Sequence, residues 1–136
     1  MKQLRKQARE AVLQALYAKS LSEEDSKKVL IDINLRYEFD EPTKEFVHDL
    51  FYATIENEQS ISSQIELHLK NWSIERINLI DKIILQMSLA EMIHLKQYDI
   101  SHKITISTAI ENAKKFSSDE SIAFVNGILD SIFKKQ

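Results

Sequence analysis

The 136-residue sequence has no cysteine, only one glycine and only one proline. Without cysteine the chain can form neither a disulfide framework nor a thiolate metal site, and it lacks a cysteine nucleophile. A single glycine excludes the glycine-rich loops that cradle phosphates, because each of those motifs needs at least two. Hairpin-rich β folds are disfavoured because their turns depend on glycine and proline. We therefore predict an all-α fold, with one domain over residues 1–136.

Long apolar runs are also missing from the sequence. No stretch approaches the roughly 18 apolar residues that a membrane-spanning helix needs. The N-terminus, MKQLRKQARE, has charges throughout and no apolar segment typical of a signal peptide. We expect a cytoplasmic protein that does not enter a membrane.

Charge is distributed unevenly along the chain, although the net charge is only −3. The first ten residues have an excess of bases, whereas residues 21–66 hold twelve acids and four bases. A basic end on an acidic body indicates an anionic partner for that end. The simpler interpretation is a solvated helix start, and charge alone favours it. The cations concerned are Lys2, Arg5, Lys6 and Arg9, which we expect to lie mostly off the apolar face of their helix.

Apolar residues recur every three or four positions along most of the chain, as they do in amphipathic helices. The pattern predicts helices over residues 3–20, 23–36, 41–58, 60–70, 74–95, 102–116 and 119–134. The helix over 74–95 is apolar on most sides, which predicts a central position among the others. Trp72 lies in the joint before it.

Several polar residues stand where helices are expected to begin, because their side chains can accept backbone N–H bonds. The predicted starts are Ser22 with Asp25, Asp40 before Pro42, Ser73, and Ser117 with Glu120. Gly127, the single glycine, falls inside the last predicted helix, where it disfavours the helix by about 1 kcal/mol relative to alanine. We expect another helix to cross there so closely that no Cβ fits.

Signals for catalysis are weak. None of the four histidines lies three or four residues from another. Asp81 and Glu91 share a helix but are about 15 Å apart along it, too far for a cooperating carboxylate pair. We therefore expect no catalytic residue, no metal site and no cofactor.

Signals for nucleic-acid binding are better. Phe116 and Phe124 stand near Lys114 and Lys115, and aromatic rings beside cations suit unstacked bases. Phe124 fits a core stripe equally well. Four phosphate contacts from the basic end would give a salt slope of about −3, which is modest. We expect RNA binding to need a partner protein that completes the site.

Three parts of the sequence together resemble the NusB family of bacterial transcription antitermination factors. They are Arg9-Glu10 with QALY at 14–17, IDKIIL at 80–85 with Ala90-Glu91, and AIENAKKF at 109–116 followed by FVNGILD at 124–130. These segments occur in the family's order and cover nearly the whole chain. The pairing of the last two motifs at this spacing is the most specific feature.

The resemblance implies about seven helices in two small packed bundles and a role without catalysis. It implies binding to the boxA element of nascent RNA together with NusE, a protein of the small ribosomal subunit. That assembly belongs to an antitermination complex that keeps RNA polymerase elongating, notably in ribosomal RNA operons.

The resemblance also assigns candidate contacts by position. The RNA-binding residues are Lys2, Arg5, Lys6, Arg9, Lys103, Lys114, Phe116, Glu120 and Phe124. The residues facing NusE are Tyr17, Asp81 and Glu91.

The sequence departs from the family pattern at several positions. Gln7 dilutes the basic end, Ser107 and Thr108 replace a usual Asn-Glu, and Ser101 stands where proline is common, a change expected to affect only loop stiffness. Two alternatives remain open. One is the NusB-like module of a ribosomal RNA cytosine methyltransferase, and the other is a structural helical adaptor or homodimer that hides the basic end.

Overall fold

The computed structural model describes residues 2–70 and 73–134, and all regular structure within these ranges is helical. The α-helices are α1 (Lys2–Leu21), α2 (Ser26–Leu35), α3 (Glu41–Glu56), α4 (Glu58–Leu67), α5 (Leu79–His94), α6 (His102–Phe116) and α7 (Asp119–Phe133). Two single 3-10 turns, η1 (Ile74–Arg76) and η2 (Lys96–Tyr98), flank α5. The all-α prediction with seven helices is confirmed. Trp72 lies outside the described residues.

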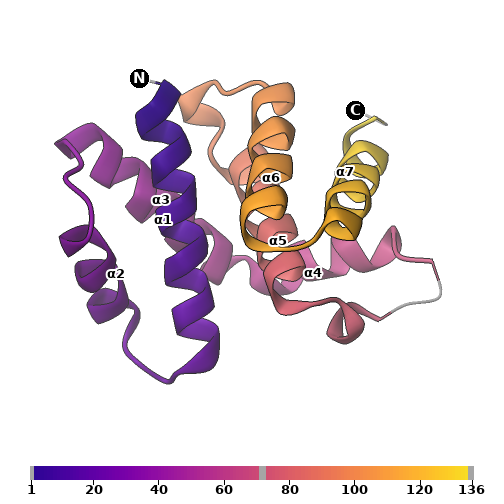
Figure 1. Ribbon diagram of the computed structural model, residues 1–136, viewed down its shortest axis with the longest axis horizontal. Helices are drawn as coiled ribbons and strands as arrows, with labels where there is room; N and C mark the ends of the chain where they lie inside the picture. Colours follow the sequence, from indigo (N-terminus) through magenta and orange to yellow (C-terminus); the bar gives the residue numbers. More distant parts are fainter. Residues whose placement is uncertain (1, 71–72, 135–136) are drawn as a thin grey trace.

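The helices form two groups that share one continuous apolar core (Figure 1). In the first group α1 packs against α2 and α3, and in the second α5 packs against α4, α6 and α7. Helix α5 also contacts α1 and α3, so it joins the two groups. Its residues from Ile83 to Met92 are all buried, which confirms the central position expected from its apolar character.

Helix α5 begins later than the sequence pattern predicted. Ser73 makes no side-chain cap, and only the η1 turn follows it. The side chain of Asn78 instead accepts the backbone N–H of Asp81 at 3.2 Å. Ile74 lies in the η1 turn and Ile77 directly follows it. Both are buried although neither is part of α5, so their spacing continued the apolar pattern of the helix.

The predicted helix starts at serine were wrong at two further places. The Ser22 hydroxyl donates to the Ala18 carbonyl of the preceding helix, and α2 begins only after Asp25. Helix α7 is capped by Ser118, because the Ser117 hydroxyl is engaged elsewhere. The start at Asp40 is confirmed, since its carboxylate accepts the Thr43 N–H at 3.0 Å.

Gly127 does not mark a close helix crossing. It is exposed on α7, its φ is not positive, and a Cβ built there would meet nothing within 4 Å. The prediction of a crossing helix is therefore wrong.

Ser101 does more than affect loop stiffness. Its side chain accepts the Ile104 N–H and caps α6.

Candidate nucleic-acid interface

The first turns of α1 lie beside α6, and two ion pairs cross between them (Figure 1). Lys6 Nζ is 2.9 Å from Glu111 Oε2, and Lys115 Nζ is 2.9 Å from Glu10 Oε2. The hydrogen bond and charge of Glu111 raise the pKa of Lys6. We call these four residues the α1–α6 seam. Both lysines remain about half exposed, so the seam presents cations whose charge is partly balanced.

Arg9 lies one helical turn further along and is almost completely buried. Its guanidinium makes two parallel hydrogen bonds to the Glu91 carboxylate of α5, Nε to Oε1 at 2.7 Å and Nη2 to Oε2 at 2.8 Å. The Thr105 hydroxyl of α6 donates to the same carboxylate. The expectation that the N-terminal cations lie off the apolar face is thus wrong for Arg9. Arg9 and Glu91 join three helices, and neither presents its charge to solvent.

Arg5 is half-buried against aromatic rings. Its guanidinium carbon lies 4.3 Å from the centroid of Phe46 and 5.0 Å from that of Tyr98, a cation–π arrangement. Tyr98 in turn donates its hydroxyl to Asp49 Oδ2 at 2.6 Å, and burial together with this hydrogen bond raises its pKa. The rings of Phe46 and Tyr98 therefore hold the Arg5 side chain in place near the start of α1. The side chain of Lys2 lies outside the described residues.

The outer face of α6 presents two exposed cations of the predicted set. Lys103 and Lys114 are exposed, and no ion pair involves either within the described ranges. They are eleven residues apart, which places them on one side of the helix about 16 Å from each other. This face therefore presents two separated positive charges that suit two non-adjacent phosphates of one backbone.

The turn between α6 and α7 adds aromatic surface at the end of α6 that carries Lys114 and Lys115. Phe116 and Phe124 pack against the core but remain partly exposed. Lys115 Nζ lies 5.4 Å from the centroid of Phe116, and Glu120 is exposed in the first turn of α7. Cations and partly exposed rings thus adjoin one another here, the combination that suits unstacked bases.

The three residues predicted to face the protein partner differ in exposure. Tyr17 is 39% exposed, whereas Asp81 is 6% exposed and Glu91 is 4% exposed. Asp81 accepts the hydroxyls of Ser117 and Ser121 at 2.8 Å and 2.7 Å. Only Tyr17 is open to a partner in this conformation, and it lies in the last two turns of α1, away from the α1–α6 seam.

Sequence reasoning missed the residues that organise this surface. Glu10, Glu111, Ser117 and Ser121 engage groups up to 105 positions away along the chain. Helical spacing relates only residues three or four apart, so it gave no signal for these contacts.

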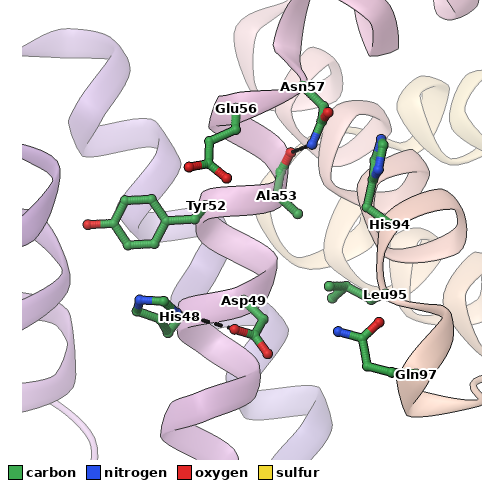
Figure 2. A pocket seen from close by; sticks show the side chains of 9 residues that line it. All are labelled: His48, Asp49, Tyr52, Ala53, Glu56, Asn57, His94, Leu95 and Gln97. Carbon is green, nitrogen blue, oxygen red and sulfur yellow. Dashed lines mark hydrogen bonds and ion pairs between the residues drawn. The ribbon is translucent and has the colours of Figure 1, made fainter.

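A separate groove of about 530 Å³ lies between α3 and the segment that follows α5 (Figure 2). Its walls include the carboxylates of Asp49 and Glu56 and the imidazoles of His48 and His94, and no lysine or arginine lines it. Figure 2 shows His48 directed toward Asp49, with 3.2 Å between Nδ1 and Oδ1. Two carboxylates without a neighbouring lysine or arginine disfavour phosphate in this groove.

Among residues 2–70 and 73–134, no group of three or more histidine, aspartate or glutamate side chains is placed to hold a metal ion. No helix in this part of the chain has both the length and the apolar character needed to cross a membrane.

Comparison with known proteins identifies relatives along nearly the whole chain. The model of the NusB family matches residues 6–134. The transcription antitermination protein NusB of Bacillus cereus (strain B4264) is 38% identical over 128 residues, covering 94% of this chain and 95% of that protein.

Solved structures show the same fold. NusB of T. maritima has a TM-score of 0.86 and 32% identity, covering 97% of this chain and 92% of that one. A chain from a crystal structure of antitermination factors NusB and NusE in complex with dsRNA has a TM-score of 0.89 and 26% identity, with full coverage of both chains. Family model, sequence relatives and fold agree, and the chain belongs to the NusB family.

Proposed function

We propose that this protein is a transcription antitermination factor that binds boxA-like RNA together with NusE and supports elongation by RNA polymerase, as in ribosomal RNA operons. The observation that supports the proposal most directly is the likeness, over the full length of both chains, to a chain of the complex of NusB and NusE with RNA. The name shared by its close relatives supports the same role. The proposal assigns no reaction to the chain, and it places the chain in the cytoplasm, where nascent RNA is made.

The RNA-binding surface that we propose contains those predicted residues whose side chains reach solvent. It consists of Arg5, Lys6, Lys103, Lys114, Phe116, Glu120 and Phe124. Arg9 supports this surface from beneath, because its guanidinium is already paired with Glu91. We assign Tyr17 to the surface for NusE.

The proposal is tested by titrating the protein with a labelled single-stranded RNA that contains boxA, with and without NusE. A scrambled RNA of the same length and a duplex RNA serve as controls for sequence and strandedness. We expect the tightest binding to the boxA strand when NusE is present. Binding of neither RNA nor NusE at moderate salt would contradict the proposed function.

A further inference from the structure

The carboxylate of Asp81 lies in the first turn of α5 and is buried without a cation. No ion pair involves it among the described residues. Its two oxygens instead accept two hydroxyls, Oδ1 from Ser117 at 2.8 Å and Oδ2 from Ser121 at 2.7 Å. The N-terminus of α5, where anions are stabilised by the helix dipole, further compensates the charge. A buried carboxylate satisfied in this way is part of the framework of the fold.

The two serines flank the turn between α6 and α7. Ser117 is the C-cap residue of α6, and Ser121 lies in the first turn of α7. Because each oxygen of Asp81 holds one serine, a single carboxylate fixes both sides of the turn. Asn78, which caps α5, also donates to Ser117 at 3.4 Å. The turn is thereby fastened to the start of the central helix.

Each oxygen of the Asp81 carboxylate accepts one serine hydroxyl, and the two serine oxygens lie 2.8 Å from each other, so the carboxylate and both hydroxyls form one hydrogen-bonded cluster. An ion pair from Asp81 to a partner would require the exposure of a residue that is only 6% exposed here. The cluster therefore disfavours the direct partner contact expected from the family resemblance.

We propose that Asp81 is a positioning residue of the RNA-binding surface, holding the α6–α7 turn so that Phe116, Glu120 and Phe124 face the RNA. This inference rests on the proposed function for its RNA step. The clamp itself, formed by Asp81, Ser117 and Ser121, is a property of the free protein. The proposal moves Asp81 from the surface for NusE to the support of the surface for RNA.

The test compares Asp81→Asn with the double variant Ser117→Ala/Ser121→Ala, using affinity for boxA RNA and affinity for NusE as separate readouts. Both variants should weaken RNA binding by about threefold to tenfold, as expected when a positioning contact is worth roughly one charged hydrogen bond. Affinity for NusE should not change in either. The triple variant should be no worse than Asp81→Asn alone, since all three changes remove the same contacts.

The sign of the effect separates positioning from simple electrostatics. Asp81→Asn removes a negative charge, which by Coulomb attraction alone would strengthen binding to RNA. Asp119→Asn is the matched control, because Asp119 is exposed in the first turn of α7 and lies outside the clamp. We expect Asp119→Asn to leave RNA affinity unchanged or to raise it, whereas Asp81→Asn lowers it.

Other outcomes would overturn the proposal. Loss of NusE affinity in Asp81→Asn, with none in the serine variant, would make Asp81 a direct partner contact. Unchanged RNA affinity in both variants would show that the clamp does not position the surface.

Amide hydrogen exchange of residues 114–124 in the free protein tests the clamp without RNA. Residues 114–124 should exchange faster in Asp81→Asn than in the unmodified protein, and unchanged exchange would show that Asp81 does not hold the turn. This measurement keeps the inference separate from the proposed function, which fails only if the unmodified protein binds neither RNA nor NusE. Ser121→Ala alone gives a milder variant if Asp81→Asn does not fold.

Discussion

Arg9 is a cation whose charge is used inside the protein, where it is paired with Glu91. Replacing Arg9 with alanine should lower the free energy of unfolding by about 3–5 kcal/mol, because it leaves a buried carboxylate without its partner. Arg9→Lys should recover only part of this loss, since an ammonium group cannot make both parallel hydrogen bonds. Urea denaturation followed by circular dichroism measures the change.

A second substitution checks the cause of that instability. Adding Glu91→Gln to Arg9→Ala removes the unpaired charge, so the double variant should be more stable than Arg9→Ala. An Arg9→Ala protein with an unchanged urea midpoint would contradict the assigned role. Because Arg9 variants are expected to be less stable, weaker RNA binding by such a variant would not identify Arg9 as an RNA contact.

The contrast between Arg9 and Lys6 shows what the sequence pattern could not predict at this scale. Both are cations in the first three turns of α1, and both were assigned to RNA by resemblance. Each is paired with a distant carboxylate, but Lys6 remains half exposed beside Glu111, whereas Arg9 is buried against Glu91. Which cation is buried depends on where α5 crosses α1, and the spacing of residues within one helix does not contain that information.

At the scale of single helices, Gly127 offers a direct test of α7. Gly127→Ala should raise the free energy of unfolding by up to about 1 kcal/mol, since alanine loses less backbone entropy in a helix and its methyl group meets no neighbour. Thermal and urea denaturation measure the gain. A lower stability would show that the methyl group meets an obstacle at this position.

The start of α3 gives a prediction about pH. Hydrogen bonds from Thr43, through its side chain and its backbone N–H, lower the pKa of Asp40. Because the folded-state pKa lies below the unfolded value, ionised Asp40 stabilises the fold above the unfolded pKa. That contribution is lost as pH falls through the folded-state pKa.

Asp40→Asn isolates this charge, because asparagine caps helices about as well as aspartate. The unmodified protein should be more stable than the variant at neutral pH, and the difference should begin to shrink near pH 4 and disappear as the pH falls through the folded-state pKa of Asp40. Urea midpoints measured from pH 7 to pH 3 provide the comparison. A difference that persists unchanged to pH 3 would show that the charge is not its source.

The number and order of the helices could be predicted, because a helix with one buried face has apolar residues at every third or fourth position. The central helix could be predicted because it is apolar on most sides. The helix starts were less predictable where several polar residues stand together. Ser117 and Ser118 are chemically alike, but Ser118 caps α7, whereas Ser117 ends α6 and donates its hydroxyl to Asp81. The candidate surface came mostly from resemblance, since its ion pairs and its hydroxyl clamp join residues far apart in sequence.

At the scale of the whole molecule, two surface features differ in the charges they present. The outer face of α6 presents Lys103 and Lys114, whereas the groove beside α3 presents Asp49 and Glu56 without a lysine or arginine. The net charge of −3 does not reveal this local difference. RNA is therefore expected to contact the outer face of α6 and not the groove.

This separation predicts how binding depends on salt. If Arg5, Lys103 and Lys114 contact phosphates, the logarithm of the binding constant should fall with the logarithm of salt concentration with a slope of about −2. Lys103→Ala/Lys114→Ala should flatten that slope by about 1.4, because each contact with a single strand contributes about 0.7. Lys27→Ala/Lys28→Ala is the matched control, since it removes the same charge from α2, on the other side of α1 (Figure 1). Titrations at four salt concentrations measure the slopes, and an equal flattening in both variants would mean that RNA responds to net charge and has no defined face.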